Sequence, residues 1–367
     1  MSRLFSPLQV GRLQLPHRIA MAPMTRFRAD DAHVPLPFVK DYYAQRASVP
    51  GTLIVTEATI VSPRAGGYPN VPGIYTEEQI AAWRGVVDAV HAKGSYIYLQ
   101  LWALGRVAKP DVLKQDGCDL VSSSAVPAGS DYPVPRELTE EEIKGFIGDF
   151  AQAAKNAMAA GFDGVEIHGA NGYLIDQFNQ DVSNQRTDSW GGSVENRARF
   201  ALETIKAVVD VAGADRTAIR YSPWSTFQGM RMAEPLPQFT YLAKKTAEFK
   251  LAYVHLVESR IAGNADAEPT DQLDFFIDAY AAASPIMIAG GFKTDSAKDA
   301  VDKEYKNNDI IIAFGRPFTS NPDLPFRVQK EIPFRPYERE HFYVPKEPKG
   351  YLDYDFSEEF KTVQVAA

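Results

Sequence analysis

Residues 164–174 read GVEIHGANGYL, and the way this stretch begins points to the fold. Its first seven residues, 164–170, form a short run of the kind found in a strand that is buried on both faces, as in a parallel sheet. Toward its end, the quoted stretch carries a histidine, an asparagine and a tyrosine set among glycines. A doubly buried strand needs neighbours of the same kind, so the fold depends on how often the chain repeats the pattern.

The chain repeats the pattern seven more times, with amphipathic stretches between the runs. A strand followed by a helix, repeated in this way, predicts a parallel sheet that is covered on both faces. The economical closure is a (β/α)₈ barrel. We therefore predict an α/β protein, a single TIM barrel domain over residues 1–367. The other predicted strands are residues 18–25, 52–59, 95–102, 217–223, 253–259, 285–291 and 308–317.

Two of the intervening helices carry signals at their starts. Thr76 and Thr139 each stand three residues before a glutamine or a glutamate, which is the spacing of a capping box. The first helix is expected to stop at Gly94 and the second near Gly161.

An open doubly wound sheet is the structural alternative, but no G-x-G-x-x-G motif follows the first strand, where a dinucleotide-binding fold needs it. Three segments lie outside the repeat. Residues 3–16 predict a hairpin with its turn at Val10-Gly11 that plugs the bottom of the barrel. Residues 103–138 form an insertion after the third strand, and a tail follows residue 332.

The composition excludes several classes of partner. The formal net charge is -8, and no long run of Lys and Arg exists to bind nucleic acid or an anionic membrane. The N-terminus lacks the regions of a signal peptide, and no apolar run is long enough to cross a bilayer. The single cysteine, Cys118, cannot form an internal disulfide or a metal-thiolate site. We expect a cytoplasmic protein that binds small molecules and no metal.

Small and polar side chains collect where the predicted strands end. In a (β/α)₈ barrel the chemistry lies at the carboxyl ends of the strands, so these residues are expected to share one rim. Each alone has an ordinary structural explanation, but their coincidence favours a binding site. The strand ends carry Pro23, Met24, Thr25, Glu57, Ala58, Gln100, Trp102, His168, Asn171, Arg220, Gly290, Gly291, Gly315 and Arg316.

The last two strand ends indicate a phosphate site, because the loops that follow the seventh and eighth strands commonly bind phosphate in such barrels. Gly290, Gly291 and Gly315 lack a Cβ and let backbone N–H groups approach an anion, while Arg316 offers a bidentate cation. The alternative is that these glycines only shape turns. The position of the loops favours a phosphorylated ligand.

Several longer segments resemble the Old Yellow Enzyme family of flavin-dependent ene-reductases, fungal members in particular, and the resemblance covers nearly the whole chain. The most specific match joins HGANGYLIDQF (168–178) to SNQRTDSWGGSVENRARF (183–200). Further matches are HRIAMAPMTR (17–26), GGYPNVPGIYTEEQIAAW (66–83), YLQLWALGR (98–106) and AFGRPFTSNPDL (313–324).

The resemblance implies noncovalently bound FMN across the mouth of the barrel. Arg220 is always protonated and would compensate negative charge at the pyrimidine edge of the reduced ring. The phosphate is expected at Gly290, Gly291, Gly315 and Arg316, and the ring is expected to contact Pro23, Met24, Thr25, Ala58, Gln100 and Arg220.

The polar end of the opening stretch then acquires an expected role. By the resemblance, His168 and Asn171 donate hydrogen bonds to the carbonyl oxygen of the substrate, and Tyr173 protonates the alkene carbon next to that carbonyl. The expected activity is an NADPH-dependent ene-reductase that reduces enones, unsaturated aldehydes or maleimides in a ping-pong cycle. The choice of NADPH over NADH is inherited from the family and is not visible in the residues.

Three positions refine the expectation. Thr25 stands where the thiol-bearing branch of the family has a cysteine, and Asn171 stands where many members have a second histidine. Some fungal relatives that act on an ergot-type aldehyde replace the tyrosine by an apolar residue, which favours isomerisation. Because this chain keeps Tyr173, we expect net reduction.

An aromatic set is expected on the substrate side by resemblance, with ordinary core packing as the alternative. Residues 260–270 are expected to form a loop over the pocket. The aromatic residues are Tyr68, Trp102 and Tyr343, with Phe227 and Phe342 as further candidates.

Other functions stay open beside the ene-reductase: a flavin-dependent isomerase of an unsaturated aldehyde, a flavin-free barrel lyase on a phosphorylated substrate, and a noncatalytic ligand-binding barrel. A lyase would need a lysine or paired carboxylates at the strand ends. Glu57 is an acidic residue at that position, but neither a second acidic partner nor a lysine accompanies it. A binding module would not need His168 together with Tyr173. We expect a monomer or a homodimer.

Overall fold

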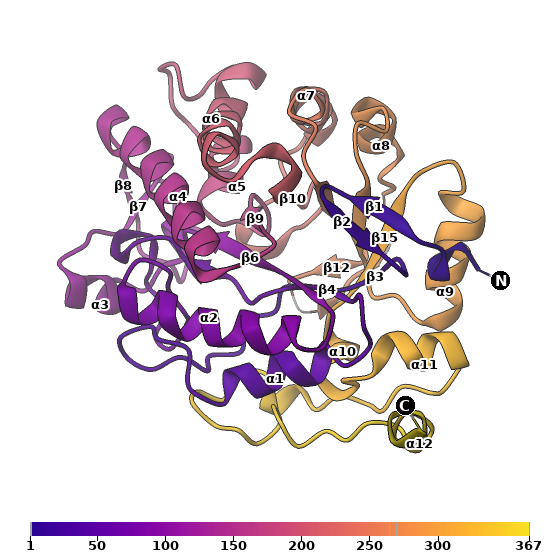
Figure 1. Cartoon of the computed structure of the whole chain (residues 1–367). Helices are drawn as coiled ribbons and strands as arrows, with labels where there is room; N and C mark the ends of the chain where they lie inside the picture. Colours follow the sequence, from indigo (N-terminus) through magenta and orange to yellow (C-terminus); the bar gives the residue numbers. More distant parts are fainter. Residues whose placement is uncertain (1, 264, 269–270, 367) are drawn as a thin grey trace.

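Parallel strands close into a barrel in the computed structural model, which describes residues 2–263, 265–268 and 271–366. The barrel strands are β3 (Ile19–Met21), β4 (Leu53–Val55), β6 (Tyr96–Trp102), β9 (Gly164–His168), β10 (Thr217–Tyr221), β11 (Tyr253–Val257), β14 (Ile286–Ala289) and β15 (Ile310–Phe314). They neighbour one another in the order β4-β3-β15-β14-β11-β10-β9-β6, and pairing between β4 and β6 closes the ring (Figure 1). The predicted (β/α)₈ barrel is confirmed.

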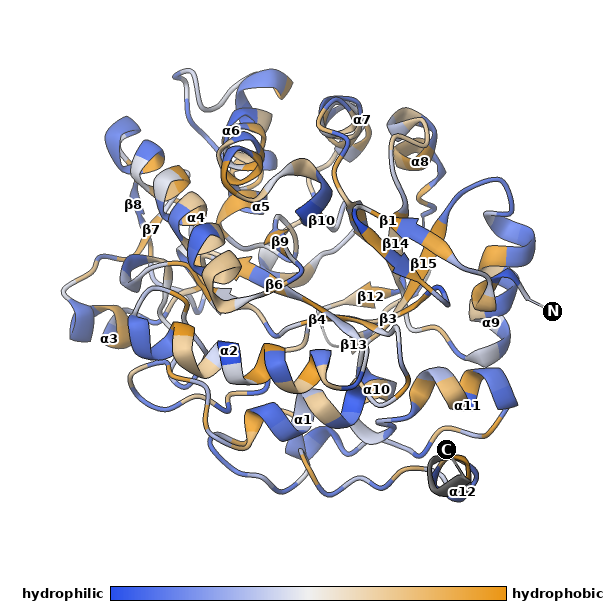
Figure 2. Ribbon diagram, viewed as in Figure 1, coloured by the Kyte–Doolittle hydropathy of each residue, from blue (hydrophilic) through white to orange (hydrophobic). Residues whose placement is uncertain are grey.

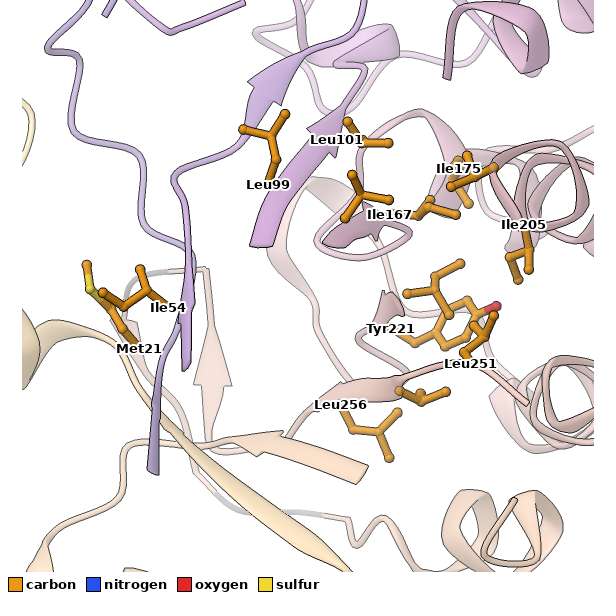
Figure 3. Packing of buried hydrophobic residues seen from close by; sticks show 14 of the residues in the cluster. Met21, Ile54, Leu99, Leu101, Ile167, Ile175, Ile205, Tyr221, Leu251 and Leu256 are labelled. Carbon is orange, nitrogen blue, oxygen red and sulfur yellow. The ribbon is translucent and has the colours of Figure 1, made fainter. Parts of the chain in front are cut away.

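Side chains along each strand alternate between two layers, because successive residues of a strand point to opposite faces. On β9, Val165 and Ile167 join the apolar layer between the strands and the helices, whereas Glu166 and His168 face the interior of the barrel. Figure 3 shows part of the outer layer, in which Ile167 lies among side chains from neighbouring strands and helices. The outer layer is the main core of the protein.

Helices surround the barrel, as the alternation of strand and helix predicts (Figure 1). Figure 2 shows the barrel strand β15 largely in the hydrophobic colour, whereas helices around the barrel, such as α2 and α4, carry both hydrophobic and hydrophilic residues. The helices that follow the strands are α1 (Val39–Arg46), α2 (Glu77–His91), α4 (Glu140–Ala160), α5 (Leu174–Asn179), α6 (Val194–Ala212), α7 (Pro235–Ala247), α8 (Asp274–Tyr280), α9 (Thr294–Asp299), α10 (Arg316–Ser320) and α11 (Leu324–Lys330).

Both predicted capping boxes are present. The hydroxyls of Thr76 and Thr139 each accept a hydrogen bond of 3.2 Å from the backbone N–H three residues later. Helix α4 ends before Gly161, whose φ of 96° is in the left-handed region that favours glycine. Helix α2 ends at His91, three residues before the predicted stop at Gly94.

All eight barrel strands are shorter than the predicted ranges, and in two of them the cause can be identified. The first, predicted over residues 18–25, ends at Met21 because Pro23 has no N–H to donate to a ladder. The second, predicted over residues 52–59, divides into β4 and β5 (Thr59–Ile60). Between them the backbone N–H of Glu57 leaves the ladder and donates to the Tyr43 hydroxyl over 2.9 Å.

The N-terminal hairpin closes the end of the barrel opposite the carboxyl ends of the strands. Strands β1 (Leu8–Val10) and β2 (Leu13–Leu15) pair antiparallel, and their apolar residues pack against inward-facing side chains such as Tyr98 and Met287. The turn lies at residues 11–12, one residue later than predicted. Gly11 has a φ of 54°, and a Cβ there would lie 2.0 Å from the carbonyl oxygen of Asp215. The predicted plug is present.

Shorter elements fill the insertion, the loops and the tail. Among the described residues, no helix combines the length and the apolar character that a membrane span requires. The short elements are η1 (Arg3–Phe5), η2 (Pro63–Ala65), η3 (Gly105–Val107), α3 (Pro110–Leu113), η4 (Lys114–Asp116), β7 (Val121–Ser122), β8 (Arg136–Glu137), η5 (Ala214–Arg216), η6 (Phe227–Gly229), β12 (Ile261–Ala262), β13 (Ala265–Asp266), the π-helical η7 (Ala300–Glu304), η8 (Arg339–His341) and α12 (Glu358–Ala366).

Candidate functional site

A cavity of about 640 Å³ opens at the carboxyl ends of the barrel strands, and every barrel strand or the loop that follows it contributes to its lining. On β14 and β15 the inward-facing side chains become smaller toward this end. Met287 is followed by Ala289 on β14, and Ile311 by Ala313 on β15. Because alanines replace larger side chains, the mouth is hollow while the layers below it are filled.

The cavity brings together nearly all the residues that the sequence predicted for the site. Two residues are exceptions. Trp102 is fully buried and lies behind the cavity wall, with its ring 4.9 Å from the ring of Tyr173, and Glu57 is buried outside the lining, where it accepts a hydrogen bond from the backbone N–H of Arg26. The predicted residues that line the cavity are Pro23, Met24, Thr25, Ala58, Tyr68, Gln100, His168, Asn171, Tyr173, Arg220, Gly290, Gly291, Gly315, Arg316 and Tyr343, together with Phe227 and Phe342.

The lining also contains residues that sequence reasoning missed, among them Phe27, Lys109 and Gln228. Phe27 and Gln228 have φ values of 58° and 60°, in the left-handed region that non-glycine residues rarely adopt. Nothing local in the sequence marks these two conformations, because the surrounding loops impose them.

A polar layer lies in the barrel interior at the cavity. The register pairs Gln100 with Glu166, and it pairs Arg220 with both His168 and His255. The side-chain amide of Gln100 donates to Glu166 over 2.7 Å. The Arg220 side chain is buried, and its Nε has no hydrogen-bond partner among the described residues. Burial lowers the pKa of Arg220, but a guanidinium remains charged at neutral pH.

The loop after β9 carries His168, Asn171 and Tyr173 to one wall of the cavity. Asn171 has a φ of 58°, and its backbone N–H donates to the Ser222 hydroxyl over 2.7 Å. The backbone N–H of Gly172 donates to Asp176 at the start of α5 over 2.9 Å. These two hydrogen bonds hold a turn that local propensity alone would not favour.

The side chains on this wall are suited to donating hydrogen bonds. Burial, assisted by the positive charge of Arg220, lowers the pKa of His168 well below its usual value, so the imidazole is neutral. Its Nδ1 is buried without a hydrogen-bond partner among the described residues. Burial, with Tyr68 nearby, raises the pKa of Tyr173 well above its usual value, so the phenol stays protonated. The rings of His168 and Tyr173 lie 4.8 Å apart.

At the predicted phosphate site, formed by the glycines after β14 and β15 and by Arg316, the arginine is already paired with a carboxylate. Arg316 forms a two-point ion pair with Asp266, with N···O distances of 2.5 and 3.2 Å. Asp266 belongs to the hairpin of β12 and β13, whose Ile261 and Gly263 line the cavity. This hairpin is the larger part of the loop predicted over residues 260–270, of which residues 264, 269 and 270 lie outside the described residues.

An aromatic rim stands over the cavity. Phe27 contacts Tyr68 and Tyr343, with ring centroids 6.4 and 5.8 Å away. The tail that carries Tyr343 is held from below by two buried arginines, since Arg26 and Arg28 both donate to the carbonyl oxygen of Phe342. The C-terminal segment is therefore part of the site and not an appendage.

The residues present fit FMN. Buried polar atoms without partners are rare in folded proteins, so Arg220 Nε and His168 Nδ1 indicate polar ligand atoms in the cavity. Gly291 has a φ of 66°, which turns the backbone sharply beside Arg316. The pairing of Arg316 with a carboxylate shows that its guanidinium can receive an anion at two points. The alanine-lined hollow between these polar ends has room for a ring system.

Comparison with protein families gives one match over most of the chain. The model of the NADH:flavin oxidoreductase / NADH oxidase family matches residues 3–335. The chanoclavine-I aldehyde reductase fgaOx3 of Penicillium roqueforti (strain FM164) is 67% identical, over 100% of both chains. The NADP-dependent oxidoreductase lnbE of Aspergillus flavus is 56% identical, over 98% of this chain and 97% of the relative. A relative from Epichloe festucae var. lolii, easA, is 54% identical and is described as a probable inactive reductase.

Comparison with solved structures also finds similar flavin oxidoreductases that match nearly the whole chain. Old Yellow Enzyme from Pichia sp. AKU4542 superposes with a TM-score of 0.91 at 38% identity, over 97% of this chain and 94% of that chain. Morphinone reductase superposes with a TM-score of 0.90 at 39% identity, over 98% and 97%. A second morphinone reductase structure, in complex with tetrahydroNAD, has a TM-score of 0.89 at 39% identity, over 97% and 98%.

Proposed function

Because the chain belongs to the NADH:flavin oxidoreductase / NADH oxidase family, we propose that it uses noncovalent FMN to reduce the activated C=C bond of α,β-unsaturated carbonyl compounds with NADPH. One observation carries the proposal. A single cavity joins the wall of His168, Asn171 and Tyr173 to the buried cation of Arg220 and to the anion corner at Arg316.

The residues that would hold FMN divide into two groups. Gly290, Gly291, Gly315 and Arg316 would receive the phosphate, in place of the carboxylate of Asp266. Bound there, FMN supplies a two-electron carrier that accepts hydride from a nicotinamide and passes it to an activated alkene. The ring would contact Pro23, Met24, Thr25, Ala58, Gln100 and Arg220, all of which line the cavity.

The wall after β9 would bind and protonate the substrate. His168 and Asn171 would donate hydrogen bonds to the carbonyl oxygen, which develops negative charge as the neighbouring double bond is reduced. The protonated hydroxyl of Tyr173 would then give its proton to the carbon next to the carbonyl. Because Tyr173 is present, net reduction is favoured over isomerisation.

The reductant and the substrate are proposed from the relatives. The 56% identical relative is named as an NADP-dependent oxidoreductase, and one structure of morphinone reductase is a complex with tetrahydroNAD. The 67% identical relative is named as an aldehyde reductase. We therefore propose NADPH as the hydride source and an α,β-unsaturated aldehyde as the preferred substrate, with the two binding to the same cavity in turn. Family membership disfavours the flavin-free lyase.

The test begins with the visible spectrum of the purified protein, which should show bound flavin that protein denaturation releases as FMN. Anaerobic addition of NADPH should bleach that absorption, with NADH as the comparison. Oxidation of the reduced protein should then be followed with chanoclavine-I aldehyde, simpler unsaturated aldehydes, enones and maleimides. A protein that stays colourless after incubation with FMN would refute the proposal, as would a product that keeps its double bond.

A further inference from the structure

Glu166 is a buried acidic group that the proposed function does not use. It lies on β9 two residues before His168, on the same face of the strand, and its side chain has no exposed surface. An isolated carboxylate at such a position would be very costly to bury, so its ionisation requires partners.

Three donors satisfy the Glu166 carboxylate. The Gln100 amide donates to one oxygen over 2.7 Å. The other oxygen accepts from the Tyr253 hydroxyl over 2.9 Å and from His255 Nδ1 over 3.0 Å. Burial acts to raise the pKa of Glu166, but His255, the charge of Arg220 and the Gln100 hydrogen bond outweigh it and hold the pKa below its usual value. Glu166 is therefore a carboxylate at neutral pH.

The layer as a whole then carries one positive and one negative charge. Burial lowers the pKa of His255, so its imidazole is neutral and donates from Nδ1. The guanidinium of Arg220 is the cation and the carboxylate of Glu166 is the anion. Because the two lie in one buried layer, where water screens little, the carboxylate offsets a substantial part of the potential that Arg220 creates in the cavity.

Glu166 also determines which atom Gln100 can present to a ligand. One N–H of the Gln100 Nε2 donates to Glu166, which fixes the orientation of the amide and leaves Oε1 to accept a hydrogen bond from a ligand. Next to it, Arg220 offers only donors. An acceptor beside a charged donor complements an imide edge, in which an N–H adjoins a carbonyl. The pyrimidine ring of a flavin has such an edge.

We propose that Glu166 is a positioning residue for bound FMN: it fixes the orientation of the Gln100 amide and, by offsetting the charge of Arg220, keeps the reduction potential of the bound flavin lower than Arg220 alone would set it. The inference rests on the proposed function. A lower potential favours hydride delivery to the substrate and opposes excessive stabilisation of the reduced state.

The test is the Glu166→Gln variant, which keeps the size of the side chain and removes its charge. Removing the anion stabilises reduced FMN, so the ratio of the dissociation constants of oxidised and reduced FMN should increase about tenfold, equivalent to a rise of about 30 mV in the two-electron midpoint potential. The potential is measured by anaerobic titration against a reference dye. Tyr253→Phe is the matched control, because it removes one hydrogen bond to Glu166 and keeps the charge; it should change the ratio less than about threefold.

A second pair of variants covers the case in which Glu166→Gln folds poorly because Arg220 is left unpaired. Arg220→Met should lower the reduction potential of the bound flavin. Adding Glu166→Gln to Arg220→Met should raise the ratio of the dissociation constants of oxidised and reduced FMN about tenfold above its value in Arg220→Met alone. The double variant buries no unpaired charge. If it has the same potential as Arg220→Met, the proposal is wrong.

The outcomes separate the two proposals. Wild-type protein that never binds FMN would refute the proposed function. Wild-type protein that binds FMN, with a Glu166→Gln variant whose potential is unchanged or lower, would refute only the role of Glu166.

Discussion

Replacing Tyr173 by phenylalanine should slow the reduction of an unsaturated aldehyde about 10²-fold, equivalent to ~3 kcal/mol of transition-state stabilisation. The pKa of Tyr173 lies well above its usual value because of burial, so the hydroxyl is a proton donor over the whole neutral range. Its ring packs 4.9 Å from Trp102 and 4.8 Å from His168. Phenylalanine keeps both ring contacts, so the loss should be chemical and not structural.

The assay measures the two half-reactions separately by anaerobic stopped-flow absorbance. Reduction of the flavin by NADPH requires no proton from Tyr173 and should stay within about twofold of wild type, whereas reoxidation by the aldehyde should carry the whole loss. Tyr98→Phe is the matched control: Tyr98 is a buried tyrosine in the filled part of the barrel whose hydroxyl has no hydrogen-bond partner among the described residues. Its two rates should match the wild type. Equal slowing of both half-reactions by Tyr173→Phe would exclude the proton-donor role.

Three further predictions follow from the site and the fold. His168→Ala should weaken the binding of enones and phenolic ligands about tenfold or more, and unchanged affinity in this variant would remove His168 from the carbonyl site. Because the imidazole of His168 is neutral, the affinity of the wild type should not change with the ionisation of His168 at and above pH 6.5. Arg316→Ala should weaken FMN at least about tenfold while leaving riboflavin, which has no phosphate, unaffected; equal losses for both, measured by fluorescence quenching, would place the phosphate elsewhere. Thr139→Ala should remove one capping hydrogen bond of α4 and cost about 1 kcal/mol, a fall of roughly 1 °C in Tm, whereas Thr139→Ser should keep the wild-type value; an unchanged Tm in Thr139→Ala would show that this cap does not stabilise the protein.

The local features of this protein could be predicted because they depend on neighbours in the sequence. The capping boxes at Thr76 and Thr139 require only residues three positions apart, and the strands are recognisable as short apolar runs. The rim residues could also be predicted, since a parallel barrel places every strand end on one side. Where a local rule had a competitor, the prediction was less accurate, as at Pro23, which ended a strand early.

The tertiary structure alone decided the features that depend on barrel closure. Trp102 was expected at the substrate, but it lies behind Tyr173, packed with apolar residues of the insertion after β6 such as Val107 and Leu113. The partners of Glu166 come from two other strands, β6 and β11, and the anion that pairs with Arg316 comes from a hairpin 50 positions away in the chain. A sequence pattern specifies which residues each strand presents to the interior. Which of them meet, and therefore which charges are balanced and which are left for a ligand, depends on register and closure, because these set distances between groups that no local interaction constrains.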